Sequence, residues 1–275
     1  MPVLIEHYNP SFPVNMQIEY CKSERIKPRS IRNILVLKLD HIGETSKLHT
    51  TAQLCLLVDA IPTGLSSSVL SIFRRKRAIT FPEIVLDKER ELNALSKYPG
   101  VFKNEFLIGM HPGVGNPIRE WPIAYFARLA NLLVEKYAAQ IILFGGAEER
   151  HLTSDLYNFI KEKQKVTSLI GKTSLEEYMF LVRKCHALIG NMSGLSHIAA
   201  LLGVPTLTIV GGQVLPQEWH PLGRRSLSVR LKVDCAPCYK SGIGECPYGI
   251  KCLASLSPEG VFTATRQLLQ MIKKP

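Results

Sequence analysis

From residue 106 onward the sequence repeats one pattern: a short apolar run, a polar loop rich in glycine, and a segment with helical spacing. The apolar runs have the length of buried strands, and the connections between the segments are short. Strand and helix in alternation predict a parallel sheet with helices on both faces, that is, a doubly wound α/β domain. We interpret as strands F-L-I-G-M-H at 106–111, I-I-L-F at 141–144, T-S-L-I-G at 167–171, A-L-I-G at 187–190 and T-L-T-I-V at 206–210.

Helix signals fall between these runs. The segment W-P-I-A-Y-F-A-R-L-A-N-L-L-V-E-K-Y at 121–137 is strongly amphipathic, with Pro122 near its first turn. Ser174 and Glu177, three residues apart, form a capping box that predicts the start of another helix. Further helices are expected over 88–97, over 148–163, over 196–202 and in the last segment, capped at Ser257.

The pattern is weaker in the N-terminal part. Residues 1–30 have no clear period and contain N-P, F-P and K-P, which predicts an irregular extension. I-L-V-L-K-L at 34–39 predicts a buried strand, and I-V-L at 84–86 is a second candidate. We therefore expect a reduced α/β domain over 31–104, followed by the main sheet domain over 105–275.

Composition and charge limit the class of protein and the kind of partner that this chain can have. Hydrophobic residues make up 46% and charged residues 21%, which is ordinary for a globular protein. The apolar runs fall short of the ~20 residues that span a bilayer, and the N-terminus lacks the features of a secretory signal, so we expect a cytoplasmic protein. The net charge of +11 suits an acidic partner: nucleic acid, an anionic membrane face or a phosphorylated small molecule; a merely solvated basic surface is the alternative. No nucleic-acid motif accompanies this charge.

The loops that follow the strands are the candidate site, because ligands of open parallel sheets bind at the carboxyl ends of the strands. Ser193 and Gly194 stand where a helix begins, and the free amides and dipole of a helix start favour phosphate. Gly113 and Gly115 belong to a glycine-rich loop whose amides can approach an anion. Met192 is the exception, an apolar side chain in a turn of small and polar residues. The loops are 111–119, 145–149, 171–175 and 190–197.

Each single residue also has an ordinary structural interpretation. Glu148 suits the first turn of a helix, where the dipole stabilises an acid. Arg119 is equally a surface charge, and His197 a histidine satisfied within its helix. A nucleotide-binding oxidoreductase is disfavoured, because the turns do not read G-x-G-x-x-G with an acid about 20 residues on.

The order of the motifs is more specific than any one of them. H-P-G-x-G-x-x-x-R-x-W-P, L-F-G-G-A-E-E, G-K-T-S-L-E-E, G-N-x-S-G-L-S-H-I-A-A-L-L-G-V-P and W-x-P follow one another. This succession resembles glycosyltransferase family 9, the ADP-heptose:lipopolysaccharide heptosyltransferases, over about residues 106–270. A weaker resemblance begins at I-L-V-L-K-L-D-H-I-G-E (34–44).

The resemblance implies a GT-B-like arrangement of two Rossmann-type domains, the N-terminal one reduced here. It implies transfer of a heptose from a nucleotide sugar, ADP-heptose, to a lipopolysaccharide-core glycolipid, with inversion and without a metal or other cofactor. A position on the inner face of an anionic membrane would suit such an acceptor. Glu44 would be the general base and Arg119 the cation on the phosphates, with Glu148 at the ribose and Thr173 near adenine. Donor binding is assigned to Gly113, Gly115, Gly146, Glu148, Thr173, Met192, Ser193, Gly194 and His197.

Three departures from the family pattern leave a second hypothesis open. Gly43-Glu44 replaces the usual G-D, and an added methylene can displace the carboxylate by about an ångström and cost ~100-fold in rate. Met192-Ser193-Gly194 replaces D-S-G or D-T-G, and the acceptor-side domain is short. The alternative is a degenerate member that binds a nucleotide sugar or an envelope partner without catalysis.

Four cysteines cluster near the C-terminus as C-x2-C-x7-C-x5-C: Cys235, Cys238, Cys246 and Cys252. Free thiols in an irregular segment are the favoured interpretation. Four thiolates would suffice for a structural zinc, but the spacing is not the paired C-x2-C type.

Overall fold

The computed structural model describes residues 3–7, 84, 86–102 and 106–273. By contacts the chain divides into two units, and one of them comprises Met1–Asn9, Phe81–Pro216 and His220–Pro275. The predicted strand at 34–39 and Glu44 lie outside the described residues. Residues 84 and 86 are in neither a helix nor a strand, so at these two positions the strand predicted at 84–86 is wrong.

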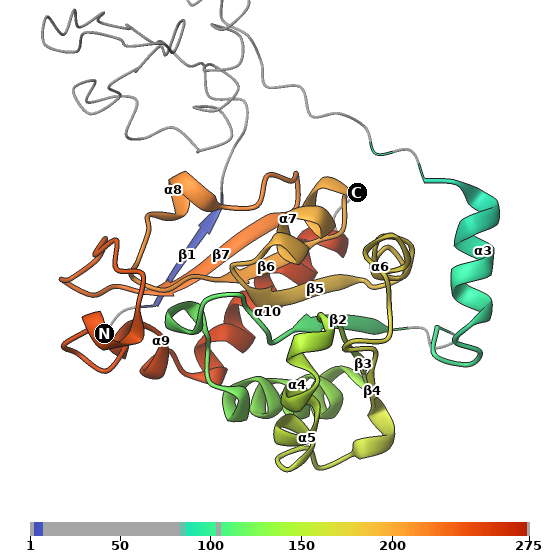
Figure 1. Cartoon of the computed structure of the whole chain (residues 1–275), viewed down its shortest axis with the longest axis horizontal. Coiled ribbons are helices and arrows are strands. Elements are labelled where there is room, and N and C mark those ends of the chain that lie inside the picture. The colour runs from blue at the N-terminus through green and yellow to red at the C-terminus, as the bar shows by residue number, and fades with distance from the viewer. Residues whose placement is uncertain (1–2, 8–83, 85, 103–105, 274–275) are drawn as a thin grey trace, which may run out of the picture. The chain divides into compact units, whose positions relative to one another are not determined.

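A seven-stranded sheet forms the centre of the described unit (Figure 1). The strand order is β1-β7-β6-β5-β2-β3-β4, and every neighbouring pair is parallel except β1 and β7. This confirms the predicted α/β class and the mostly parallel sheet. The strands are β1 (Val3–His7), β2 (Leu107–His111), β3 (Gln140–Leu143), β4 (Val166–Ser168), β5 (Ala187–Asn191), β6 (Thr206–Ile209) and β7 (Ser226–Leu231).

Helices cover both faces of the sheet because alternate strand residues are apolar on each side. On one face Ile108 packs in a core with Phe126 and Leu268, from α4 and α10. On the other face Leu188 packs with Tyr178 of α6. The helices are α3 (Lys88–Ser96), α4 (Ile123–Tyr137), α5 (His151–Tyr157), α6 (Leu175–Val182), α7 (Gly194–Leu201), α8 (Pro216–Trp219), α9 (Lys251–Ala254) and α10 (Pro258–Lys273). Short 3-10 turns are η3 (Pro117–Arg119), η4 (Ala147–Glu149), η5 (Lys163–Lys165) and η6 (Ile243–Glu245).

The helix signals are confirmed, with shifted ends. The Ser174 hydroxyl accepts the Glu177 amide at 3.1 Å while the Glu177 carboxylate accepts the Ser174 amide at 2.8 Å, as a capping box predicts. Pro122 is the N-cap of α4, next to its first turn as predicted. Helix α5 is shorter than the predicted 148–163, because η4 turns tightly before it and the lysine-rich residues beyond Ile160 have no apolar side chain to bury.

The N-terminus corrects the sequence interpretation. Residues Val3–His7 are not irregular but form β1, antiparallel to β7, with Val3 opposite Leu231. The partner strand lies at the other end of the chain, so no local pattern could reveal the pairing. Gly260 of α10 permits this close packing, since a Cβ there would lie 3.2 Å from Val3 Cγ2.

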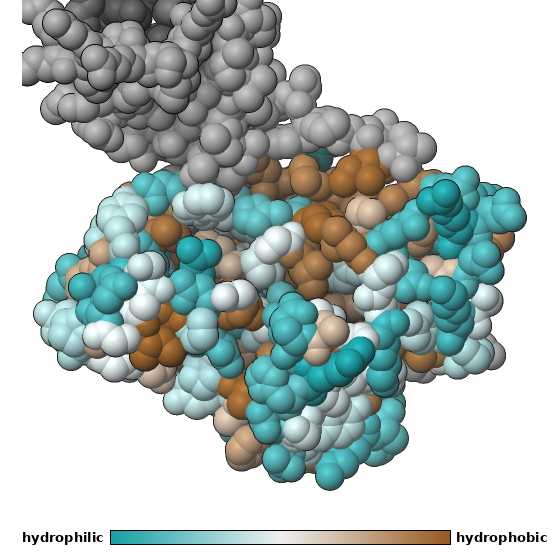
Figure 2. Space-filling view, in the orientation of Figure 1, coloured by the Kyte–Doolittle hydropathy of each residue, from teal (hydrophilic) through white to brown (hydrophobic). Residues whose placement is uncertain are grey.

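Helix α3 was expected in the acceptor-side domain, but it packs on the sheet unit. Arg90 Nη1 lies 2.7 Å from Glu176 Oε1 of α6, and the Tyr98 hydroxyl donates to the Lys172 carbonyl at 2.7 Å. The domain boundaries at 30/31 and 104/105 stay predictions. Within the described residues no helix is both long and apolar enough to cross a membrane. The face in Figure 2 is mostly hydrophilic, with hydrophobic patches between.

Candidate functional site

The strand order reverses between β2 and β5. The chain runs outward through β2, β3 and β4, then returns to the other side of β2 with β5, β6 and β7. Such a switch point opens a crevice at the carboxyl ends of the two central strands. Here those ends are His111 of β2 and Asn191 of β5, with His111 opposite Gly190. Gly190 allows the close approach, because a Cβ there would lie 2.9 Å from the His111 carbonyl oxygen.

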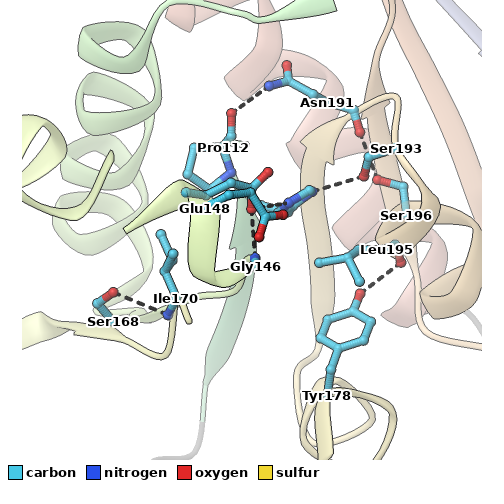
Figure 3. Close-up of polar contacts among 12 residues, drawn as sticks. Pro112, Gly146, Glu148, Ser168, Ile170, Tyr178, Asn191, Ser193, Leu195 and Ser196 are labelled. Atoms are coloured by element: carbon cyan, nitrogen blue, oxygen red, sulfur yellow. Dashed lines mark hydrogen bonds and ion pairs between the residues drawn. The ribbon is translucent and has the colours of Figure 1, made fainter. Parts of the chain in front are cut away.

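Asn191 joins the loops that leave the two strands. Its side chain is fully buried, its Nδ2 donates to the Pro112 carbonyl at 2.6 Å, and its Oδ1 accepts the Trp121 amide at 3.1 Å. The Ser196 hydroxyl of α7 donates to the Asn191 carbonyl at 2.9 Å (Figure 3). Asn191 therefore holds the glycine-rich loop and the start of α4 through its side-chain amide, and the start of α7 through its backbone carbonyl.

His111 lies between a carboxylate and a hydroxyl. Its Nε2 is 3.1 Å from Glu149 Oε2, its Nδ1 is 2.9 Å from Ser193 Oγ, and its side chain is 4% exposed. Burial by itself raises the pKa of Glu149, but the His111 ring and the Gly146 amide, at 2.8 Å, together hold it below the ordinary value. Glu149 is thus a charged acceptor at neutral pH.

The predicted glycines divide into two kinds. A Cβ on Gly113 would collide with the Glu149 carboxylate, which His111 holds in place, so this position serves close packing. A Cβ on Gly146 would meet only the carboxylate of Glu148, an exposed side chain. Around Gly115 and Gly194 a Cβ would meet nothing within 4 Å, which leaves open space at the loop and at the start of α7.

Arg119 ends η3 and is half-buried. The turn is held from two sides: Asn116 Nδ2 donates to the Ser241 carbonyl at 2.7 Å, and Gln213 Nε2 donates to the Ile118 carbonyl at 2.6 Å. Arg119 Nε and Gln213 Oε1 are buried with no hydrogen-bond partner among the described residues. A donor and an acceptor left unsatisfied beside the crevice are what a polar ligand would satisfy.

The remaining predicted residues lie on the same edge or beside it. Glu148 is exposed in η4, Thr173 is half-buried just before the α6 N-cap, and His197 is half-buried in the first turn of α7. Ser193 is the N-cap of α7 but makes no side-chain capping bond, because its hydroxyl contacts His111.

Met192 does not point into a polar loop. It is 4% exposed and packs in a small apolar cluster with Val210 and Val214. The side chain that stood out in the sequence is therefore a packing residue between the loops after β5 and β6. Its assignment to donor binding stays a prediction.

The four C-terminal cysteines are free thiols. Burial raises the pKa of Cys252, and the nearby thiols add to this while the Gly212 amide opposes it. The Ile250 amide donates to Cys246 Sγ at 3.4 Å. Within the described ranges, no group of three His, Cys, Asp or Glu side chains could hold a metal ion.

Sequence reasoning missed four residues that build the edge: His111, Glu149, Asn191 and Gln213. All four lie in the motifs quoted above or next to them. Each is a polar residue at the end of a strand or in the loop that follows it, and this position was the available signal. In the sequence, donor binding was assigned to the neighbouring glycines and not to these polar residues.

A mostly parallel sheet whose strand order reverses between its two central strands is the fold of a Rossmann-type domain, as in GT-B glycosyltransferases. The sequence model of glycosyltransferase family 9 (heptosyltransferase) matches residues 50–248, and the chain belongs to this family. It is 33% identical over 172 residues to lipooligosaccharide heptosyltransferase 2 of Haemophilus ducreyi, covering 61% of this chain and 49% of the relative. It is 32% identical over 128 residues to lipopolysaccharide heptosyltransferase 2 of Salmonella typhimurium, covering 46% and 36%.

Solved structures agree on the fold. The family 9 glycosyl transferase of Veillonella parvula gives a TM-score of 0.64 at 22% identity, over 82% of this chain and 60% of that one. The E. coli ADP-heptose lps heptosyltransferase II gives 0.59 at 22% identity, over 73% and 57%. The chain spans about half the length of the curated relatives it matches.

Proposed function

We propose that this chain binds a nucleotide-activated heptose, ADP-heptose, at the carboxyl edge of its sheet and transfers the heptose to a lipopolysaccharide-core glycolipid. Membership in the family and the names of the relatives support the reaction class. The observation that carries the donor site is the start of α7, with the Ser193 hydroxyl turned toward His111 and open space at Gly194. Such a helix start receives an anion favourably.

The donor would be held mainly through its diphosphate. The amides of the first turn of α7 have no partners within the helix, and His197 lies on that turn. Arg119 offers a buried unsatisfied N–H on the opposite side of the switch point. The Glu148 carboxylate would accept hydrogen bonds from the ribose hydroxyls, and Thr173 would lie near the adenine ring. Positive groups fixed beforehand around the leaving diphosphate are worth more than mobile ones, because they need no reorganisation.

Transfer is a single displacement. An acceptor hydroxyl oxygen forms a bond to the anomeric carbon while the bond from that carbon to the diphosphate oxygen breaks. The electron pair of the broken bond leaves with ADP, and the hydroxyl proton passes to a carboxylate, for which the motif offers Glu44. Attack on the face opposite the leaving group inverts the anomeric centre. Arg119 and the helix amides would neutralise the departing charge, so the proposal assigns no metal or cofactor.

The second candidate is a binding protein without catalysis. Met192 packs among valines where the family motif has a carboxylate. This observation favours a member that binds the donor and does not transfer the sugar.

We place the protein in the cytoplasm, in peripheral contact with the inner membrane face. A net charge of +11 supports attraction to an anionic leaflet, where glycolipid acceptors reside. Nucleic acid is not a proposed partner.

One experiment separates the two candidates. The protein is incubated with ADP-heptose and heptose-deficient lipopolysaccharide, and both released ADP and heptosylated product are quantified. Equal amounts of ADP and product, both lost in Arg119→Gln, would support the enzyme. Tight ADP binding with neither product would support binding alone.

A further inference from the structure

His111 is a buried histidine with both ring nitrogens engaged. It is 3% exposed, Glu149 lies at Nε2 and Ser193 at Nδ1. His111 is the first residue of the H-P-G motif, and no role follows for it from that motif. The protonation state of this ring has a consequence beyond packing. It decides whether Nδ1 donates a hydrogen bond to the Ser193 hydroxyl or accepts one from it.

The proton on Nε2 is settled by the chemistry of Glu149. A charged carboxylate only accepts, so Nε2 carries hydrogen. Nδ1 then has two states. In the neutral ring Nδ1 accepts the Ser193 hydroxyl proton, which removes that proton from any ligand. In the imidazolium Nδ1 donates to Ser193 Oγ, and the hydroxyl proton is released to point elsewhere.

Ser193 is placed to use that released proton. A serine at an N-cap ordinarily accepts an amide of the first helical turn, yet Ser193 makes no such bond. The first-turn amides of α7 therefore stay available, beside a hydroxyl whose orientation is set by His111. Gly194, next in the chain, is exposed with open space where a side chain would be.

We propose that His111, held by Glu149, is a positioning residue that turns the Ser193 hydroxyl into a donor for a diphosphate oxygen. This inference rests on the proposed function for the identity of its anion. Binding of the diphosphate favours the imidazolium, because only that state frees the Ser193 proton. By linkage, protonation of His111 in turn strengthens binding.

Other ionisable groups lie around His111 and Ser193 and can also contribute to a pH dependence of binding. Glu149 faces His111 directly, and His151 of α5 and Glu120 after η3 act on Glu149 electrostatically. The neighbouring turns also carry Arg119, Glu148, Arg150 and His197. A pH effect must therefore be assigned to His111 by substitution.

The test measures binding of ADP-heptose, and of ADP-ribose as a second sugar diphosphate, from about pH 5 to about pH 8, the range in which histidine side chains generally change charge. Both phosphates of these probes are diesters and do not titrate in that range. We expect the affinity of the unaltered protein to fall about tenfold as pH rises, since a charge-assisted hydrogen bond is lost. His111→Gln is expected to bind weakly with a flat profile, whereas His151→Gln, the matched control, keeps the slope.

Ser193→Ala distinguishes a positioning role of His111 from a structural one, because a structural role of His111 would not make the pH dependence of affinity require the Ser193 hydroxyl. It should lose the same pH slope as His111→Gln, and the double variant should bind no more weakly than either single one. The ¹⁵N resonances of the His111 ring should report hydrogen on both nitrogens in the ADP-heptose complex. A retained slope in His111→Gln, additive losses, or a neutral ring in the complex would overturn the proposal.

The two proposals fail differently. Binding that depends on His111 without heptose transfer would remove the enzyme and leave the positioning role. Transfer with pH slopes that are equal in all variants would do the reverse. Absence of binding for both probes would overturn both.

Discussion

Asn191 Nδ2 lies 2.6 Å from the Pro112 carbonyl oxygen, and this buried hydrogen bond joins the ends of the two strands between which the strand order reverses. The same amide also accepts the Trp121 backbone N–H. The Asn191 side chain thus holds the loop after β2 and the residue before the α4 N-cap against the end of β5.

Replacing Asn191 should therefore affect both stability and binding. We expect Asn191→Ala to lower the free energy of unfolding by about 1–3 kcal/mol, because buried partners lose their hydrogen bonds. ADP affinity should fall as well. Urea denaturation and calorimetric titration measure the two effects. Asn158→Ala, at an exposed helix end, is the control and should change little. Equal losses in both variants would contradict the role of Asn191.

Arg119 should affect the reaction more than the fold. We expect Arg119→Gln to lower kcat about 100-fold, because a fixed cation is lost from the leaving diphosphate. The urea midpoint should stay nearly unchanged. Arg128→Gln is the matched control, since that side chain is exposed and pairs with Glu259 at 3.2 Å. Loss of stability without loss of kcat would mean that Arg119 is structural.

Met192→Asp should not restore a working carboxylate. The new charge would enter a cluster with Val210 and Val214, where desolvation opposes it. We expect a lower thermal midpoint and no gain in heptose transfer, whereas Met192→Leu keeps the volume and costs less than about 1.5 kcal/mol. Thermal melts and the transfer assay measure both properties. A rise in activity for Met192→Asp would show that the missing acid is the defect.

Glu149 should contribute stability that depends on pH. Its pKa in the folded protein is lowered, so its contribution is full above the unfolded value of about 4.3 and is lost as pH falls through the folded pKa. Glu149→Gln should thus destabilise the protein at neutral pH, with a difference that shrinks in acid. Denaturation at several pH values gives this difference. Asp155→Asn, exposed within α5 and beyond its first turn, is expected to show no such trend; a constant gap for Glu149→Gln would contradict the role of the Glu149 carboxylate.

We expect the stability of the protein not to depend on a metal bound by the four clustered cysteines. We expect purified protein to contain less than about a tenth of an equivalent of zinc, and a chelator to leave the thermal midpoint unchanged. Thiol reagents should modify the half-buried Cys235, Cys238 and Cys246 in the native protein. They should spare Cys185, whose pKa burial raises to about 12. Stoichiometric zinc that stabilises the fold would reverse this interpretation.

The sequence predicted a structural feature correctly where all the interacting residues lie in one short segment of the chain. The Ser174–Glu177 capping box and the amphipathic residues of α4 are of this kind, and both are confirmed. Strand β1 is not, because its partner β7 lies more than 200 residues away in the chain. The end of α5 was misplaced: the helix ends at Tyr157, and the lysine-rich residues beyond Ile160 have no apolar side chain to bury.

The sequence by itself determined the α/β class, the loops that meet at one edge of the sheet, and the family. These follow from periodicity and motif order, which are local or additive along the chain. Only the tertiary structure decided what the individual side chains in those loops do. Met192 packs against valines, and His111 comes within hydrogen-bonding distance of Glu149 and Ser193 from three separate loops. The physical reason is that the orientation and proton sharing of a side chain depend on neighbours that only strand order brings together.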